Sequence, residues 1–457
     1  MKLIKSKKAN INYLAKIIRI NGFESHPNAD ALKCAFVDGY KVIVGLNEPE
    51  GKYVYFPTSC EINPNLLTFA NLYRDKTLNA NSEVKPGFFE NNGRVKAVKL
   101  RGIVSEGFLM PLETLCNFIS SELSLDVKSF DIEANIEFDS FSHNNKEFWI
   151  CKKYIIKSNN ASSSSNHRKA VINSKIVDGQ FRKHYETAIY RKEPTAISPY
   201  DLISISSKWD GTSQISAYIL CKQKLNWKQK IAKWLTGEEF NKYDYVFSSR
   251  NVIQNENLDN KKSYYGTGDY SSRLAAHKVL EPHLIPGMSI YYEIVGYTNE
   301  GKAWIKRAGQ DMDYGCIPST TEYKEGINFK IYIYRITLTN IRGDVHEFSP
   351  REVQKWCDRE GLRACEQFYY GFAGDLFRDL DIFDIDWCYK FIDKLADNKD
   401  FYMEMNSPDC NNKVPHEGIV IKKDDGTPNA VKLKTFLHLS GEQRDLDTGI
   451  TNTEDES

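Results

Sequence analysis

The sequence predicts a multidomain protein of the β and α+β classes, in which a small β-barrel precedes a domain of antiparallel sheets with flanking helices. Three observations lead to this prediction. At 457 residues the chain is long enough for two or three domains with separate cores. A serine- and asparagine-rich run at 157–166 divides the chain. The segment before this run is rich in short strand-like patterns, and the segment after it mixes helix and strand patterns. We therefore expect domain boundaries near residues 150 and 168.

Residues 1–150 contain short strand-like segments separated by glycine and proline. Several short strands with few helices are typical of a small closed barrel, and the OB-fold is the natural candidate. Lys96, Lys99 and Arg101 could follow nucleic-acid phosphates on such a barrel. The expected strands cover 13–20, 34–36, 41–46, 53–56 and 95–100.

The segment 151–168 is expected to be a linker, because a serine- and asparagine-rich composition cannot bury apolar surface. The domain at 169–457 mixes α and β patterns. One helix is predicted at 225–235, where Trp227, Ile231 and Trp234 recur at helical spacing among lysines. Those lysines could hold RNA phosphates, although a solvated helix face is their more ordinary role.

A second helix is predicted to begin after Ser349. Serine at the cap, proline in the first turn and glutamate three residues after the cap form a helix-start signal. The helix should continue to about Glu360, because Gly361 follows.

Three separated motifs predict one nucleotide-transfer site. Lys208 to Thr212 read Lys-Trp-Asp-Gly-Thr, and far downstream Glu417 to Lys422 read Glu-Gly-Ile-Val-Ile-Lys. A Val-Lys-Leu-Lys run ending at Lys434 follows. A lone Lys-x-Asp-Gly is a weak signal, but the three runs in this order are specific in combination.

The chemistry of phosphoryl attack explains these residue types. A lysine amine must lose its proton before it attacks the α-phosphate of a nucleoside triphosphate. Partial burial and neighbouring cations favour the neutral amine, and Lys422, Lys432 and Lys434 could supply such cations beside Lys208. The same lysines would neutralise charge that develops on the phosphates. Strand alternation puts Lys432 and Lys434 on one face.

Glu417 is the candidate ligand for Mg²⁺ or Mn²⁺, which would bridge to the phosphates. Glu417 and Lys422 are an odd number of positions apart, so a regular strand would point them to opposite faces. A shared site therefore requires Glu417 at the mouth of the strand, or a local twist there.

In these motifs the chain resembles the covalent nucleotidyltransferases, namely ATP-dependent DNA ligases, RNA ligases and mRNA capping enzymes. The resemblance implies that Lys208 is the nucleophile. It also implies that Arg250, in Ser-Ser-Arg-Asn, contacts the sugar or phosphates, and that Glu293, in Tyr-Tyr-Glu-Ile-Val-Gly, binds the ribose. Tyr334, in Tyr-Ile-Tyr-Arg-Ile, would stack on the base.

The order of the segments resembles RNA ligases with an amino-terminal OB module and a carboxy-terminal nucleotidyltransferase domain. DNA ligases and capping enzymes usually carry arginine at the position of Ser213 and append an OB-fold domain, for which 435–457 are too few residues. The Phe-x-x-His-x-x-Thr stretch containing His184 also matches these RNA ligases. Asp210 in the Lys208 motif is more typical of DNA ligases and capping enzymes than of RNA ligases. The roles of Asp210 and His184 stay open.

This resemblance implies an ATP-dependent RNA ligase that joins 5′-phosphate and 3′-hydroxyl ends through a lysyl-AMP and an AMP-capped 5′ end. It implies ATP and Mg²⁺ or Mn²⁺ as cofactors, and a nicked duplex or broken RNA strand as the partner of a monomeric repair enzyme. A DNA ligase or a GTP-using capping guanylyltransferase is the first alternative. A non-catalytic RNA-binding protein with a degenerate transferase domain is the second, because the amino-terminal region also resembles tRNA-binding OB modules.

Bulk composition limits the remaining possibilities. Basic and acidic side chains balance at 61 each, so nucleic acid would have to bind to local patches. Ten cysteines without a Cys-x-x-Cys pair argue against zinc and for buried thiols in a reducing compartment. With neither an apolar signal core nor a membrane-spanning stretch, we expect a soluble intracellular protein that does not bind membranes.

Overall fold

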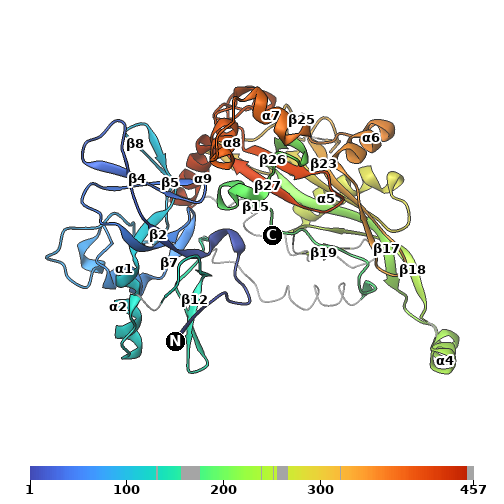
Figure 1. Ribbon diagram of the computed structural model, residues 1–457. Coiled ribbons are helices and arrows are strands. Elements are labelled where there is room, and N and C mark those ends of the chain that lie inside the picture. Colours follow the sequence, from blue (N-terminus) through green and yellow to red (C-terminus); the bar gives the residue numbers. More distant parts are fainter. Residues whose placement is uncertain are drawn as a thin grey trace. The chain divides into compact units, whose positions relative to one another are not determined.

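The computed structural model of the protein divides into two compact units (Figure 1). The first unit comprises residues 1–155 with 188–196, and the second comprises 156–187 with 197–457. Of the linker predicted at 151–168, residues 151–155 belong instead to the first unit and include a strand at Cys151–Lys153, and residues 156–168 lie outside the described residues. The structure describes residues 1–129, 132–155, 175–237, 239–250, 252–254, 266–319 and 321–449.

The segment 188–196 belongs to the first unit, which the sequence did not indicate. Within that unit, the backbone N–H of Ile189 donates to Asn12 Oδ1 at 3.3 Å. Arg191 donates from Nη1 to the carbonyl oxygen of Gly39 at 2.8 Å. These hydrogen bonds join residues far apart in the sequence, which no local pattern reveals.

A four-stranded antiparallel sheet forms the centre of the first unit, and each of its faces packs against a separate core. On β6, Val54 and Phe56 belong to one core, whereas Tyr53 and Tyr55 belong to the other. This division follows from the alternation of side chains along a strand. In spatial order the strands are β10 (Phe108–Pro111), β6 (Gly51–Phe56), β2 (Ala15–Ile20) and β11 (Glu137–Phe138).

The predicted strand-rich first unit is confirmed, but its described strands do not close into one barrel. They form several small antiparallel sheets, and the two cores on the faces of β2 and β6 hold these together. The helices of this unit were not predicted, although the buried residues of α2 (Leu112–Leu123) recur at helical spacing. The other elements are β1 (Lys2–Ile4), β3 (Glu24–Ser25), β4 (Leu32–Val37), β5 (Tyr40–Gly45), β7 (Cys60–Ile62), α1 (Pro64–Phe69), β8 (Val98–Leu100), β9 (Ile103–Ser105), β12 (Ser140–His143), β13 (Lys146–Trp149), β14 (Cys151–Lys153) and β15 (Ala188–Ile189).

The second unit contains two larger antiparallel sheets. One holds, in order, β27 (Ala430–Lys434), β26 (Gly418–Lys423), β16 (Leu202–Lys208) and β25 (Gln367–Phe372). The other has six strands, in the order β19 (Ile253–Gln254), β18 (Asn241–Ser248), β17 (Thr212–Lys222), β20 (Met288–Gly296), β23 (Phe329–Thr339) and β24 (Val345–Glu347). A short hairpin joins β21 (Lys306–Arg307) to β22 (Gln310–Asp311).

Helices flank these sheets. The helix predicted after Ser349 is confirmed as α6 (Pro350–Glu360), with a capping box between Ser349 and Glu352 and Gly361 at its end. The helix predicted at 225–235 is α4 (Trp227–Thr236). The others are α5 (Gly266–Leu280), α7 (Ala373–Asp379), α8 (Trp387–Ala396) and α9 (Phe436–Thr448).

All ten cysteines are buried and unpaired, as the sequence predicted. Burial raises the pKa of the Cys151 and Cys410 thiols to about 12. Among the described residues, no helix combines the length and apolar character needed to cross a membrane.

Candidate active site

All four predicted lysines share one face of a sheet, and three of them lie towards the same end of it. Strand β16 ends at Lys208, which pairs with Gly418 of β26, and Gly418 pairs in turn with Lys434 of β27. Lys432 lies two positions before Lys434. Because directly paired residues share a face and side chains alternate along a strand, all three lysines point to the same side.

Glu417 lies immediately before β26 and is held between two of these lysines. Lys208 Nζ donates to Glu417 Oε2 at 2.7 Å, and Lys434 Nζ lies 3.1 Å from Oε1. The start of β26 depends on Gly418, which has φ +144°, and a Cβ atom there would lie 2.1 Å from the carbonyl oxygen of Leu433. The structure therefore places Glu417 at the strand mouth, the position that a shared site requires.

The charges of this cluster stabilise one another. Burial raises the pKa of the Glu417 carboxyl, but Lys208 and Lys434 outweigh burial and hold that pKa well below its usual range. Burial lowers the pKa of Lys434, but Glu442 and Glu417 raise it well above its ordinary value. The pKa of Lys432 is lowered, because burial exceeds the opposing effect of Glu186. Lys432 thus loses its proton more readily than Lys434.

A second buried cluster surrounds Asp210, in the same motif as Lys208. Arg307 donates to the two carboxylate oxygens of Asp210, from Nε at 2.6 Å and from Nη2 at 2.8 Å. His438 Nε2, on α9, lies 2.7 Å from Oδ2. Burial raises the pKa of Asp210, but Arg307 and His438 outweigh it, so the net shift is downward. Sequence reasoning named neither Arg307 nor His438, because neither lies in a motif with a recognisable spacing.

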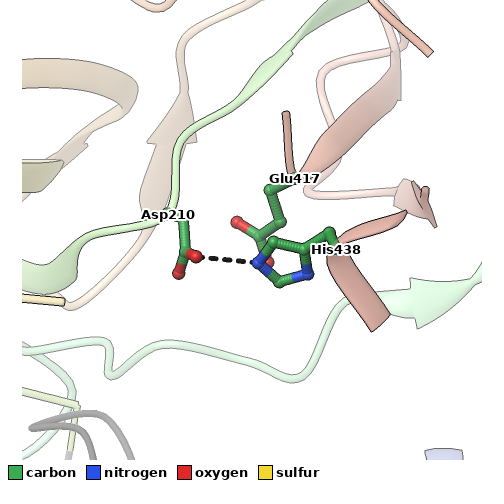
Figure 2. A group of neighbouring side chains, drawn as sticks. All are labelled: Asp210, Glu417 and His438. Atoms are coloured by element: carbon green, nitrogen blue, oxygen red, sulfur yellow. Dashed lines mark hydrogen bonds and ion pairs between the residues drawn. The ribbon is translucent and has the colours of Figure 1, made fainter. Parts of the chain in front are cut away.

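Asp210, Glu417 and His438 together form a candidate metal site. Their ligand atoms all lie within 4.8 Å of one another, and all three residues are buried. Figure 2 shows the two carboxylates and the imidazole converging, with a hydrogen bond between Asp210 and His438. Carboxylate oxygens suit Mg²⁺ or Mn²⁺, and an imidazole nitrogen is accepted more readily by Mn²⁺. The donor set therefore fits the divalent cation expected at Glu417.

Glu186 joins two further predicted residues. Its Oε1 atom lies 2.9 Å from Lys432 Nζ, and its Oε2 atom pairs with Arg250 Nη2. One carboxylate thus lies between a lysine and an arginine that are both expected to contact phosphate. An incoming phosphate group could replace this carboxylate with similar charge-assisted hydrogen bonds. The sequence contained only a weak indication that Glu186 belongs to the site. Glu186 lies in the Phe-x-x-His-x-x-Thr stretch, in which only His184 was considered.

The predicted sugar- and base-binding residues come from the six-stranded sheet. Glu293 on β20 accepts a hydrogen bond from Ser213 Oγ on β17 at 3.0 Å. Tyr334 Oη on β23 lies 3.0 Å from His184 Nδ1. Burial lowers the pKa of His184 to about 3, so its imidazole is neutral at physiological pH. His184 therefore orients Tyr334 as a neutral hydrogen-bonding partner.

Strand β23 carries a second tyrosine, but a neighbour stacks on it. The rings of Trp209 and Tyr332 are parallel within 9°, with their centroids 3.8 Å apart. Trp209 belongs to the same motif as Lys208, so this stacking fixes the motif against the six-stranded sheet. Tyr334 has no such stacked partner among the described aromatic pairs, which favours it as the base platform.

Lys422 lies further from the other lysines than the sequence suggested. It pairs with Ser204 across β16, four residues before Lys208, which is about 13 Å along the strand. Its Nζ atom lies 3.1 Å from Glu347 Oε1. Glu347 also accepts two hydrogen bonds from Arg335 Nε and one from its Nη2. Lys422 is therefore part of a different buried ion cluster.

The fold is similar to that of solved RNA ligases over nearly the whole chain. Residues 14–112 match a family model described as an OB-fold domain, which confirms that part of the prediction. No curated protein sequence matches the chain.

Solved structures with this fold come from the RNA ligase of Naegleria gruberi. The ligase with PPi has 15% sequence identity and a TM-score of 0.52, over 95% of this chain and 100% of that chain. A variant of that ligase with ATP and Mn has 14% identity and a TM-score of 0.50, over 94% and 99% of the two chains. Another variant, with AMP and Mn, has 13% identity and a TM-score of 0.50, over 94% and 98%.

Proposed function

We propose that this protein is an ATP-dependent RNA ligase that joins 5′-phosphate and 3′-hydroxyl ends. The observation that carries the proposal is the cluster in which Glu417 holds Lys208 beside Lys434. The fold shared with an RNA ligase that was solved with ATP and Mn supports it.

In the first step, Lys208 Nζ attacks the α-phosphorus of ATP. A nitrogen–phosphorus bond forms, the bond to the bridging oxygen breaks, and pyrophosphate leaves. Lys208 Nζ donates to Glu417 Oε2 at 2.7 Å, so this contact must break, and the amine must pass a proton to water, before it attacks. Lys434 and Lys432 lie on the same face and would neutralise charge on the phosphates.

The nucleotide would be held by residues from both sheets. Arg250 and Lys432, which now share Glu186, would bind phosphate oxygens. Glu293 would accept hydrogen bonds from the ribose, and Tyr334 would stack on adenine.

Asp210, Glu417 and His438 would hold Mg²⁺ or Mn²⁺. The bound cation would supply positive charge to the phosphate oxygens. Occupation of this site would engage the Glu417 carboxylate and so release Lys208 from its ion pair.

The later steps transfer AMP to a 5′-phosphate end and then seal the strand. The 5′-phosphate oxygen attacks the phosphorus of the lysyl-AMP and releases Lys208, giving a 5′–5′ pyrophosphate. The 3′-hydroxyl then attacks the 5′-phosphate and AMP leaves. We propose a nicked duplex or a broken RNA strand as the substrate, and repair as the purpose.

Labelled ATP tests the first step. The protein, incubated with ATP and Mn²⁺, should acquire an acid-labile, alkali-stable AMP adduct that is absent from Lys208→Ala. Lys423→Ala, which removes a lysine elsewhere on β26, is the matched control and should be adenylated normally. A full-strength adduct on Lys208→Ala would show that the nucleophile lies elsewhere.

The alternatives give different results in the same assays. A labelled GMP adduct would identify a capping guanylyltransferase, and faster sealing of a DNA nick than of a matched RNA nick would identify a DNA ligase. A parental protein that forms no adduct with either nucleotide would identify an RNA-binding protein with a degenerate transferase domain.

A further inference from the structure

Helix α4 presents an apolar face that the second unit does not cover. The helix has 10 residues, and none of them is buried. Figure 1 shows it beyond the ends of β17 and β18, away from both sheets. Trp227 is 68% exposed and Trp234 is 82% exposed. Most helices gain their stability by packing an apolar face, so this exposure is not explained by the folding of the helix itself.

The exposed apolar residues lie on one side of α4. Ile231 is four residues after Trp227, and Leu235 is four residues after Ile231, so helical geometry aligns them with Trp234. Both Ile231 and Leu235 are exposed. The helix therefore offers a continuous surface with a tryptophan near each end.

This surface lies in a locally basic segment of a neutral protein. No acidic residue occurs at 211–237, although acidic and basic side chains balance over the whole chain. Glu238 and Glu239 follow this segment, and Glu239 pairs with Lys233 of the helix at 2.6 Å, so the other lysines supply the positive charge. Lys222 and Lys224 precede the helix, and Lys228 and Lys230 lie on it; all four are exposed. A concentration of positive charge around exposed aromatic rings complements a polyanion that carries stacking groups.

We propose that α4 binds a single-stranded segment of the RNA substrate, with bases stacked on Trp227 and Trp234 and phosphates on the neighbouring lysines. This inference rests on the proposed ligase function. The 11 residues of β17 separate the Lys208 motif from α4 by about 35 Å. Only RNA that extends about that far from the end being sealed can reach the helix.

The variant Trp227→Leu/Trp234→Leu tests stacking, because leucine keeps apolar surface but removes the aromatic rings. Affinity for a 3′-blocked RNA with a single-stranded arm of about 20 nucleotides should fall about tenfold or more. Affinity for an RNA with an arm of about 4 nucleotides should not change. Tyr200→Leu, which removes another exposed aromatic ring of the second unit, should leave both affinities unchanged.

The variant Lys228→Gln/Lys230→Gln tests the phosphate contacts. Two lost contacts to a single strand should reduce the slope of log affinity against log salt by about 1.4. An unchanged slope, or an equal loss of affinity for long and short arms, would overturn the proposal. Neither double variant alters a buried side chain of α4, so parental thermal melting is expected.

Vesicles distinguish RNA from a membrane surface. If the leucine variant keeps full RNA affinity while the parent protein binds phosphatidylserine vesicles, α4 is an interfacial membrane helix and the proposal is wrong. Self-adenylation of Lys208 is measured separately from binding of the blocked RNA. Failure of the ligase chemistry and failure of RNA binding by α4 are therefore distinguishable.

Discussion

Glu417 pairs with two lysines through one carboxylate, and two substitutions test whether its charge is what adenylation requires. Both Glu417→Gln and Glu417→Ala should slow Mn²⁺-dependent adenylation by about 100-fold or more, because each removes the charge that binds the cation. The measurement is the rate of AMP-adduct formation across a range of Mn²⁺ concentrations. Asp425→Asn, in the turn after β26, is the control and should react normally. A parental rate in Glu417→Ala would exclude Glu417 as the metal ligand.

Tyr334 combines a ring with a hydrogen-bonded hydroxyl, and two substitutions separate them. Tyr334→Phe keeps the ring and loses the hydroxyl contacts with His184 and Ser213, so stability should fall by about 1 kcal/mol and ATP should bind normally. Tyr334→Ala also loses the stacking surface, so ATP affinity should fall about tenfold. Calorimetric titration with ATP measures the affinity of both variants, and urea unfolding measures the stability of Tyr334→Phe. Unchanged affinity in Tyr334→Ala would show that another group holds the base.

His184 makes stability depend on pH in a defined direction. Its pKa is about 3 in the folded protein because of burial, whereas an unfolded histidine has a pKa of about 6.5. The unfolded chain therefore binds a proton first, so this contribution is complete above pH 6.5 and decreases as pH falls towards 3. Between pH 7 and pH 5 the loss should be about 2 kcal/mol.

Urea unfolding of the parent protein and of His184→Gln, each at pH 7 and pH 5, measures this contribution. The parent should lose about 2 kcal/mol more than the variant over that interval. Equal losses would show that His184 is protonated in the folded protein, and hence that its environment is less apolar than the structure indicates.

At the scale of elements, the β26–β27 pair determines where Glu417 and Lys434 meet. Gly418→Ala would place a methyl group 2.1 Å from the Leu433 carbonyl oxygen and 2.8 Å from Lys434 Cα, so the two strands must separate. We expect a loss of stability of about 2 kcal/mol or more and severely reduced adenylation.

Gly426→Ala is the matched control for this prediction. Gly426 lies in the turn between the same strands and also has a positive φ, of +74°, but no atom lies within 4 Å of its ideal Cβ position. Thermal melting should show about 1 kcal/mol of destabilisation, and adenylation should be normal. If both variants adenylated equally, contact between the strands at Gly418 would not control the site.

Elements with local signals were predictable, and contacts between distant segments were not. The capping residues of α6 and the alternating lysines of β27 depend on short spacings in the sequence. The pairing of Asp210 with Arg307 and His438 depends on how β21 and α9 pack beside the Lys208 motif. For Lys422, a local motif suggested a place beside Lys208, but a contact with a distant segment decides its surroundings. Its side chain pairs with Glu347 of β24.

At the scale of the whole molecule, adenylation should need only the second unit. A fragment beginning at His167 should still form the Lys208 adduct, because every proposed nucleotide-binding residue follows that point. Its residues 188–196 would lose their partners in the first unit, so its melting temperature should be lower than that of the full chain. An absence of adduct at a temperature where the fragment is folded would contradict this prediction.

Strand sealing should depend on both units. Pre-adenylated fragment and full-length protein should be compared on a nicked duplex in single-turnover reactions at several salt concentrations. The fragment should seal far more slowly, and sealing by the full chain should weaken as salt rises, because phosphate contacts hold the duplex in register. Equal rates and equal salt slopes would show that the OB-fold module does not hold the substrate.

The ten buried cysteines give the folded protein a chemically silent background for site-directed labelling. Thiolates, which are the reactive form, are suppressed by the raised thiol pKa values of residues such as Cys151 and Cys410. A Tyr200→Cys substitution, at a position that is 88% exposed, would add a single accessible thiol without removing any native cysteine. One maleimide fluorophore at that position could then report domain movements between the successive steps of ligation in an otherwise unmodified chain.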